Sequence, residues 1–239
     1  MEMLQKITGA AKRSFSKLPK HAAFSMNGIE SWALENKKSL KEANEKAFER
    51  VKELVEMQAE LKIPVMTFYA LSEKVDLNRE FYDAYLDSLA SFFEHLPRSK
   101  LVNENKVKVS VLGKWYHLPG KVIESIKNAI DGTKDYDSMF LNFCINYDGQ
   151  EEMLDAFKII AMQVKAGKMD PELIDKDLVK ENLYSSYFIP PELIINNNRG
   201  KNTSLLLWDS VNAKVFHSKK LWQDIDGKEF NEALKWFEK

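Results

Sequence analysis

The chain has 239 residues, of which 44% are hydrophobic and 30% charged, and its formal net charge is −1. This length is enough for one domain with a full hydrophobic core. The near-neutral charge gives no reason to expect nucleic acid as a partner, because proteins that bind it carry clustered positive charge. No segment approaches the roughly 18 consecutive apolar residues of a membrane span, so we expect a cytoplasmic protein with at most peripheral membrane contact.

The N-terminal residues 1–18 mix apolar and basic side chains without the hydrophobic centre of a signal peptide. We expect a short amphipathic helix or arm there that packs on the body of the protein. The remaining residues, 19–239, contain no linker rich in proline, glycine or serine and no internal repeat. They are therefore predicted to form a single domain.

From residue 19 onward, apolar runs of strand length alternate with segments of helical periodicity. The runs are nearly continuous, which is typical of parallel strands buried on both faces. The sequence therefore predicts a single α/β domain with a mostly parallel six-stranded sheet flanked by helices. The predicted strands are Ala22–Met26, Val65–Leu71, Val107–Leu112, Phe140–Asn146, Leu193–Ile195 and Leu205–Trp208.

The lone cysteine, Cys144, lies in the apolar run "FLNFCINY" and has no partner for a disulfide. We predict a buried core thiol, because free cysteine is among the most buried residue types. Neither His117 nor His217 has an acidic or cysteine neighbour at metal-ligand spacing. The sequence therefore predicts no zinc site.

Ligands of parallel sheets bind beyond the C-terminal ends of the strands. The first of these ends, "FSMNGIESW", combines a strand, a tight turn at Asn27-Gly28 and the start of a helix, which is a common layout for binding phosphate. The residue types are unusual for such a site. Asn27 stands where a metal ion would be bound by a carboxylate, while Glu30 and Ser31 stand where an anion would be bound by arginine.

The strand ends resemble, in order and spacing, those of the cis-prenyltransferases, the undecaprenyl diphosphate synthase family, from about Pro19 to Phe237. The family's M-D-G-N-G-R-W appears as "MNGIESW", and its T-x-Y-A-F-S with E-N-W-x-R as "TFYALSEKVDLNR". Its L-N block with Y-G-G-R-x-E appears as "LNFCINYDGQEE". Its I-R-T-S-G-E-x-R segment appears as "IINNNRGKN", and its closing E-L-Y-F-T-x-x-L-W-P-D as "KVFHSKKLWQD".

The resemblance implies a cis-prenyltransferase fold with an apolar tunnel, in which isopentenyl diphosphate is condensed onto an allylic diphosphate. The family holds Mg²⁺ with an Asp and a Glu, whose places are taken here by Asn27 and Lys214. An amide is neutral and an ammonium has the opposite charge, so the resemblance implies that the magnesium site is lost and that no cofactor is bound. Lys214 either supplies a fixed positive charge in place of the metal or is an ordinary solvated lysine.

Other family positions that bind diphosphate have also changed. The family's arginines and histidine correspond to Ser31, Leu40, Asn44, Gln150, Asn196 and either Lys201 or Asn202. By resemblance, the candidate catalytic positions are Asn27 and Lys214, with no metal ligand. The candidate substrate-binding residues are Gly28, Ile29, Glu30, Ser31, Trp32, Asn44, Ser72, Arg79, Asn196, Arg199, Lys201 and Ser204.

The aromatic segment Arg79–Leu96 has two interpretations. Together with Met57 and Met66, its aromatic side chains either pack as ordinary core or line a tunnel for a prenyl chain, for which soft and adaptable residues are suitable. The aromatic residues in question are Phe81, Tyr82, Tyr85, Phe92 and Phe93.

Two hypotheses for the function follow from the resemblance. In the first, the chain is a catalytically degenerate or supporting subunit that binds an isoprenoid diphosphate or prenyl lipid. It would act as a homodimer, or as a heterodimer with an active cis-prenyltransferase. In the second, it is an active prenyltransferase or terpene cyclase of altered, magnesium-independent chemistry, with Arg199, Lys201 and Lys214 in place of the metal and the arginines. Only in the second case do we expect product formation in the presence of EDTA, which removes Mg²⁺.

Overall fold

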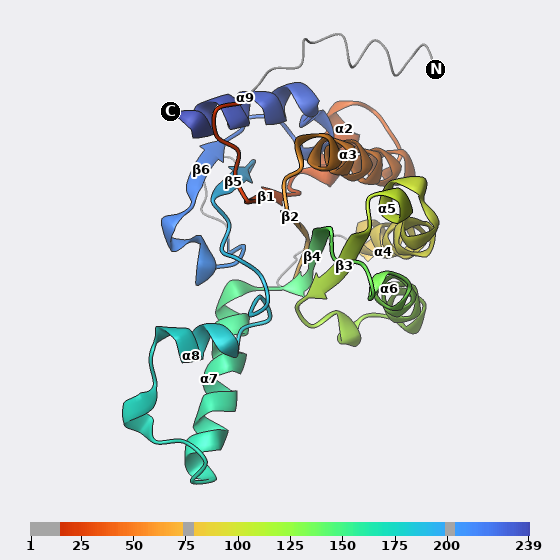
Figure 1. Cartoon of the computed structure of the whole chain (residues 1–239). Helices are drawn as coiled ribbons and strands as arrows, with labels where there is room; N and C mark the ends of the chain where they lie inside the picture. Colours follow the sequence, from red (N-terminus) through yellow and green to blue (C-terminus); the bar gives the residue numbers. More distant parts are fainter. Residues whose placement is uncertain (1–14, 74–78, 199–203) are drawn as a thin grey trace.

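The computed structural model of the chain describes residues 15–73, 79–198 and 204–239. Its centre is a six-stranded sheet in the order β3-β4-β2-β1-β5-β6, in which all paired strands are parallel (Figure 1). The single α/β domain with a parallel sheet is therefore confirmed, while residues 1–14 of the expected N-terminal arm lie outside the described residues. The strands are β1 (His21–Ser25), β2 (Val65–Ser72), β3 (Val107–Leu112), β4 (Met139–Tyr147), β5 (Leu193–Asn196) and β6 (Lys214–His217).

Helices cover the sheet, and one pair of helices projects away from it at the lower left of Figure 1. That pair is formed by α7 (Gly149–Lys165) and α8 (Lys176–Glu181). None of the helices within the described ranges is both long and apolar enough to cross a membrane. The other α-helices are α2 (Ile29–Glu35), α3 (Leu40–Leu61), α4 (Arg79–His95), α5 (Lys100–Glu104), α6 (Gly120–Thr133) and α9 (Gly227–Glu238).

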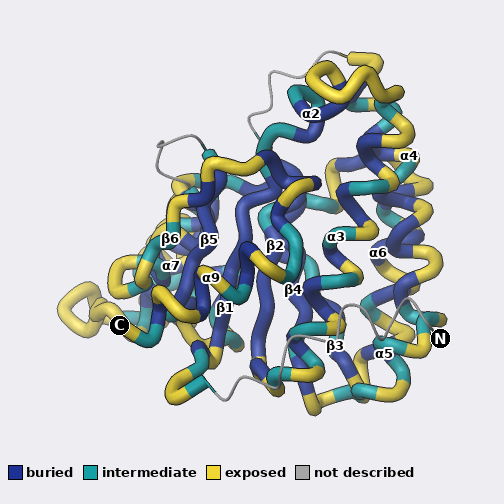
Figure 2. The backbone as a smooth tube through the Cα atoms, turned by 90° about the horizontal axis from the view of Figure 1, so that it is seen from above, coloured by how far each residue is buried: buried dark blue, intermediate teal, exposed yellow. Residues whose placement is uncertain are grey.

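The central strands β1, β2, β4 and β5 are buried on both faces, as their apolar runs predict (Figure 2). Successive side chains of a strand point to opposite faces, so Ala22 and Phe24 of β1 join the main core beneath α3 and α4, whereas Ala23 joins a smaller cluster on the other face. The predicted core thiol Cys144 lies in that smaller cluster and is fully buried. Burial also raises the pKa of this thiol well above its ordinary value.

The sixth strand is not the predicted one. Leu205–Trp208 forms a turn, and the strand that pairs with β5 is Lys214–His217. The run Leu205–Trp208 is apolar for another reason, because Leu205 and Leu206 are buried in the smaller cluster that also contains Tyr147. Because β6 is an edge strand with exposed and half-exposed residues, it lacks the apolar run by which buried strands are recognised.

The aromatic segment on α4 is core. Phe81, Tyr85, Phe92 and Phe93 are all buried in the main core cluster. The rings of Phe92 and Phe93 pack edge-to-face with a ring centroid separation of 5.5 Å, a favourable geometry for aromatic pairs. Phe81 and Tyr85 also line a pocket at the ends of β1 and β2, and Phe92 lines one between α3 and α4. Within the part of the chain that the structure describes, no continuous tunnel lined by them is shown.

His21 begins β1 and is completely buried. Its Nδ1 donates a hydrogen bond of 2.7 Å to the carbonyl oxygen of Ile189, and its Nε2 accepts one of 2.7 Å from the hydroxyl of Thr67. The ring in this arrangement is neutral. Burial lowers the pKa of His21 from 6.5 to about 4, although the hydrogen bond to Ile189 acts in the opposite direction.

The buried histidine predicts a pH dependence of stability. Between pH 6.5 and about pH 4 the unfolded chain binds more protons at His21 than the folded chain, so its contribution is complete above pH 6.5 and is lost as the pH falls. The loss amounts to about 3 kcal/mol of unfolding free energy. Urea unfolding of the wild type and of His21→Gln at pH 4.5 and pH 7 measures it.

The unfolding free energy of His21→Gln is expected to fall less between pH 7 and pH 4.5 than that of the wild type, whatever the absolute stability of the variant. The matched control is His217→Gln, at an exposed histidine on β6, which should keep the wild-type slope. Equal slopes in the wild type and His21→Gln would contradict the assignment.

Candidate functional site

The ends of β1 and β2 border a pocket of about 270 Å³ at the C-terminal edge of the sheet. This is the edge at which ligands of parallel sheets bind. Among the described residues that line it, Glu30 is the only one with an ionised side chain, so the described lining carries one negative charge and no positive charge. The β1–β2 pocket, as it is called below, is lined by Met26, Asn27, Gly28, Ile29, Glu30, Ser31, Tyr69, Ala70, Leu71, Ser72, Phe81 and Tyr85.

Asn27 is held by Asn197, which follows the last residue of β5. The backbone N–H and the side-chain Nδ2 of Asn27 both donate to the Oδ1 of Asn197, at 3.2 Å and 3.4 Å. In return, the Nδ2 of Asn197 donates to the carbonyl oxygen of Asn27 at 2.9 Å. The neutral side chain of Asn197 thus joins the end of β5 to the end of β1, mainly through the backbone of Asn27. Asn197 was not among the predicted site residues, although the run of three asparagines at this strand end was the available signal.

These residues do not fit a magnesium site of the kind that the resemblance implies. Mg²⁺ is usually bound through one or two carboxylates together with phosphate oxygens, whereas Asn27 offers a neutral amide that is already paired with Asn197. Within the described ranges, no group of three or more His, Cys, Asp or Glu side chains is placed to hold a metal ion.

Lys214 lies far from Asn27 within one chain. It begins β6 and is level with Leu193 of β5, which is level with Ala22 of β1. Asn27 follows five residues later, about 16 Å further along the strand direction at about 3.3 Å per residue. The Nζ of Lys214 instead donates to the carbonyl oxygen of Phe237 at 3.0 Å. The two predicted catalytic positions are therefore not brought together in the single chain.

Of the predicted substrate-binding residues, the structure brings one group together. Gly28, Ile29, Glu30, Ser31 and Ser72 all line the β1–β2 pocket. Two further candidates, Arg199 and Lys201, lie outside the described residues.

The remaining predicted residues have other surroundings. Trp32 donates from its Nε1 to Asp224 at 3.0 Å, and Ser204 lies 3.1 Å from the hydroxyl of Tyr69. The side chain of Arg79 is 95% exposed. Asn44 is fully buried in α3, and neither polar atom of its side chain has a hydrogen-bond partner among the described residues. Asn196 is buried and accepts a hydrogen bond from the N–H of Asn198 at 2.9 Å.

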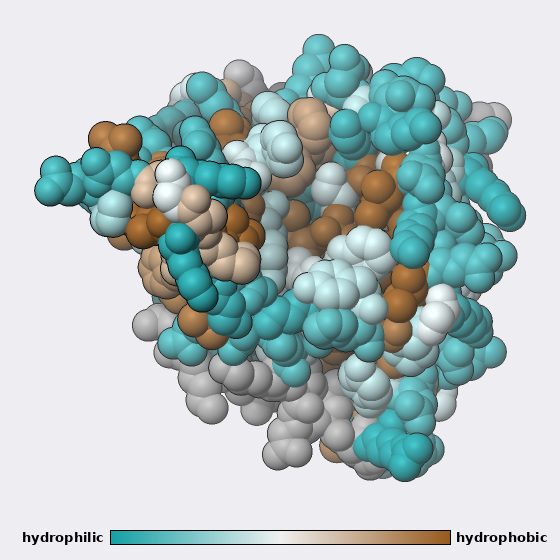
Figure 3. All heavy atoms as spheres, turned by 90° about the horizontal axis from the view of Figure 1, so that it is seen from below, coloured by the Kyte–Doolittle hydropathy of each residue, from teal (hydrophilic) through white to brown (hydrophobic). Residues whose placement is uncertain are grey.

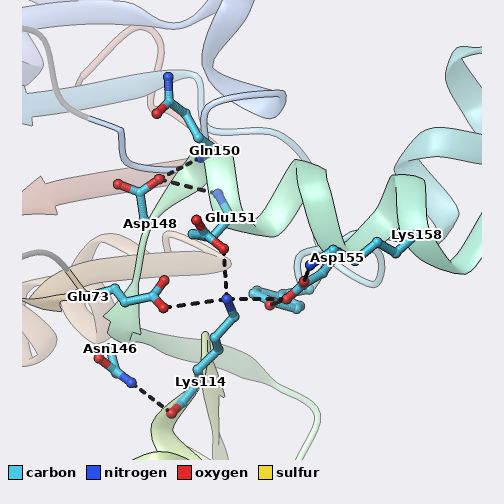
Figure 4. A network of polar contacts seen from close by, with 9 residues as sticks. Glu73, Lys114, Asn146, Asp148, Gln150, Glu151, Asp155 and Lys158 are labelled. Atoms are coloured by element: carbon cyan, nitrogen blue, oxygen red, sulfur yellow. Dashed lines mark hydrogen bonds and ion pairs between the residues drawn. The ribbon is translucent and has the colours of Figure 1, made fainter.

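A lysine at the end of β3 is neutralised by carboxylates, as Figure 4 shows. The Nζ of Lys114 lies 3.4 Å from Glu73, 2.9 Å from Glu151 and 3.7 Å from Asp155. The hydrogen bond to Glu151 is the main reason that the pKa of Lys114 is raised above its ordinary value. Because three carboxylates surround this ammonium, the cluster is net negative and offers little attraction to an anion. The sequence did not reveal it, because Glu73, Lys114 and the Glu151–Asp155 pair of α7 are distant from one another in the chain.

Gly28 makes the turn between β1 and α2. Its φ is +86°, in the left-handed region that favours glycine. A Cβ atom at this position would lie 2.5 Å from the Cδ2 of Leu221. The left-handed backbone conformation therefore selects glycine at the mouth of the pocket, and a Cβ would also require the end of the Leu221 side chain to shift.

The amino-acid sequence is similar to those of undecaprenyl diphosphate synthases. The family model described as "Putative undecaprenyl diphosphate synthase" matches residues 25–239. A tritrans,polycis-undecaprenyl-diphosphate synthase (geranylgeranyl-diphosphate specific) of Methanocaldococcus jannaschii is 32% identical over 86% of this chain and 75% of its own length. The synthase of the same description from Methanopyrus kandleri is 29% identical over 93% of this chain and 83% of its own.

A solved structure has the same fold. Lavandulyl diphosphate synthase from Lavandula x intermedia, in complex with dimethylallyl diphosphate, superposes with a TM-score of 0.87. The match covers 92% of this chain and 95% of that one, at 21% sequence identity.

The turn at Gly28 predicts a loss of stability in Gly28→Ala. A left-handed backbone conformation for alanine and the contact with Leu221 together are expected to lower the unfolding free energy by roughly 1–3 kcal/mol. Gly120→Ala is the matched control, because no atom of the described residues lies within 4 Å of a Cβ built at Gly120. It should change the unfolding free energy by less than about 0.5 kcal/mol. Equal denaturation midpoints of the two variants would show that the turn does not require glycine.

Proposed function

Because the chain belongs to the undecaprenyl diphosphate synthase family, whose members make polyprenyl diphosphates, we propose that it is a catalytically degenerate member that binds a prenyl chain and supports a partner subunit. One observation carries the proposal. At the position of the family's metal-binding aspartate stands Asn27, whose neutral side-chain amide donates to the Oδ1 of Asn197 at 3.4 Å. The charge that would hold the metal is absent from this position.

The electrostatics of the pocket support the loss of catalysis. Transfer of a prenyl group leaves negative charge on the departing diphosphate, and enzymes stabilise such charge with positioned cations and N–H donors. The described lining of the β1–β2 pocket contributes one carboxylate, Glu30, and no cation. Lys114, which follows β3 at the same edge of the sheet, is paired with three carboxylates. Both features oppose the stabilisation of a leaving diphosphate.

The apolar part of the pocket supports the binding of a prenyl chain. Met26, Leu71 and Phe81 line the β1–β2 pocket and are buried, which is what an isoprenoid tail requires of its surroundings. The similar Lavandula structure is a complex with dimethylallyl diphosphate, and the archaeal relatives are named for geranylgeranyl diphosphate. We carry the same class of ligand, an isoprenoid diphosphate or prenyl lipid, over to this chain.

A partner subunit is supported by the apolar surface of α7. This helix buries Ala156 and Ile160 against the body, yet its other sides expose Phe157 and Met162, with 45% and 61% of their surface accessible. A helix that is apolar on several sides is usually buried. Figure 3 shows apolar side chains on the projecting part of the molecule that α7 and α8 form. We propose that this surface binds a second subunit, in a homodimer or in a heterodimer with an active cis-prenyltransferase.

The second candidate is an active enzyme that works without magnesium. It is favoured by the names of the relatives, which are synthases. In that case Arg199 and Lys201, with Lys214, would have to stabilise the diphosphate. Lys214 lies at the opposite end of the sheet from the β1–β2 pocket, so within one chain it is poorly placed to stabilise a diphosphate bound there.

A turnover assay separates the two candidates. The purified protein is incubated with isopentenyl diphosphate and either geranyl or farnesyl diphosphate, with Mg²⁺ or with EDTA. We expect no product from the wild type under either condition. The double variant Asn27→Asp/Lys214→Glu should form product at no more than about one hundredth of the rate of an intact family member, because removing a single charge-stabilising group already lowers the rate about 10²–10³-fold. Product formed in EDTA would establish the second candidate instead.

The supporting role is tested by adding an intact cis-prenyltransferase. We expect complex formation in light scattering and a higher rate of product formation than the intact enzyme shows alone. Phe157→Glu should abolish both, because it places a charge in the apolar surface of α7. Glu181→Lys, at an exposed residue of α8, is the control and should keep both. If Phe157→Glu still forms the complex and still raises the rate of product formation, the partner binds to another surface.

A further inference from the structure

We propose that Asn27 is a site of spontaneous deamidation, at which the folded protein slowly converts the side-chain amide into a carboxylate. Asparagine is a thermolabile residue. It reacts fastest when glycine follows, because no side chain then hinders the backbone nitrogen of the next residue. Asn27-Gly28 is the only Asn-Gly pair in the sequence. The modification goes beyond the proposed function and does not depend on it.

The reaction needs no enzyme and no redox partner. The backbone nitrogen of Gly28 attacks the Cγ of Asn27, so that a C–N bond forms and the Cγ–Nδ2 bond breaks. Ammonia leaves with the proton that the nitrogen of Gly28 gives up, and a cyclic imide remains. Water then opens the imide, giving aspartate when the bond to Cγ breaks and isoaspartate when the bond to the backbone carbon breaks. Both products carry a carboxylate in place of a neutral amide.

The fold leaves the attacking nitrogen available. Gly28 lies in the turn between β1 and α2, and its N–H donates no hydrogen bond within the described part of the chain. In a helix or a strand this N–H would be held by a backbone carbonyl. Asn27 and Gly28 are also partly exposed and line the β1–β2 pocket, so water reaches them.

The side chain of Asn27 is held more weakly than its backbone. Its Nδ2 donates to the Oδ1 of Asn197 at 3.4 Å, beyond the roughly 2.7–3.2 Å that is typical of N–H···O hydrogen bonds. Its carbonyl oxygen accepts from the Nδ2 of Asn197 at 2.9 Å and from the N–H of Trp222 at 3.2 Å. The amide can therefore turn toward Gly28 while the backbone stays in place.

Other asparagines are protected from the same reaction. Asn44 and Asn142 are fully buried within α3 and β4, where the backbone is held in regular structure. Asn36 is exposed, but the side chain of Lys37 hinders attack by the following nitrogen. Only at Asn27 do a following glycine, an unbonded N–H and access to water coincide among the described residues.

The modification changes the mouth of the pocket. In aspartate at position 27 an oxygen replaces the Nδ2 donor and faces the Oδ1 of Asn197, so a hydrogen bond becomes a contact between two acceptors. The described lining then carries the new carboxylate in addition to that of Glu30. An anionic ligand is consequently repelled more strongly.

The test is peptide mapping of the full chain by mass spectrometry during incubation at pH 8.5, in buffer and in urea. Trypsin cleaves after Lys20 and Lys37, so the peptide 21–37 reports Asn27 and Asn36 together. In buffer we expect Asn27 to convert at least about tenfold faster than Asn36 and within about tenfold of its own rate in urea, where no fold protects it. Asn27→Gln is the matched control, because its longer side chain must close a larger ring, and it should show no conversion at this position.

Equal rates at Asn27 and Asn36 in buffer would overturn the proposal and leave the proposed function standing. A rate at Asn27 that is more than about tenfold lower in buffer than in urea would do the same, because the fold would then protect this amide.

The consequence for the pocket rests on the proposed function and has its own measurement, calorimetry of dimethylallyl diphosphate in EDTA. Asn27→Asp carries the new charge without isoaspartate and should bind about fivefold more weakly than fresh wild type, as should wild type in which Asn27 has been converted. Equal affinity of all three samples would contradict the repulsion. No binding by fresh wild type would overturn the ligand class of the proposed function, while the peptide map still decides the modification.

Discussion

The pairing of Asn27 with Asn197 is the interaction on which the rest of the site depends. The side chain of Asn197 hydrogen-bonds the backbone N–H and carbonyl oxygen of Asn27 and, at 3.4 Å, accepts from its side-chain amide, so that the end of β1 is joined to the end of β5. A carboxylate at this position would attract a dication and, through it, a diphosphate. With the amide, the mouth of the pocket is held together by hydrogen bonds that need no metal. The single carboxylate of the described lining, Glu30, and the neutralised Lys114 then leave little to attract an anion.

The residues shared with the family have structural roles that do not require catalysis. Gly28 permits the turn against Leu221, and Trp32 is hydrogen-bonded to Asp224. The hydroxyl of Tyr69 donates to the carbonyl oxygen of Tyr147, linking β2 to β4. These contacts hold the ends of the strands in position whether or not chemistry takes place there. A chain that is selected only for its fold would keep these structural residues and lose the charged residues that bind metal and diphosphate.

The fold could be predicted from the sequence because the buried strands are continuous apolar runs, and the site could be predicted only in part. Gly28 to Ser31 are local neighbours, so the motif placed them together. The separation of Lys214 from Asn27 within one chain could not be predicted, because it depends on the register of an edge strand with no apolar run. Asn197 and the carboxylates around Lys114 were missed because their contacts join residues distant in sequence, which no local pattern reveals.

The most direct test of the absent metal site is a crystal structure of the protein grown with geranyl thiodiphosphate and saturating Mn²⁺, which replaces Mg²⁺ and is located by its anomalous scattering. We expect the thiodiphosphate tail in the β1–β2 pocket and no manganese peak in contact with Asn27. A manganese ion at about 2.1 Å from the Oδ1 of Asn27, bridging to the diphosphate, would contradict the account.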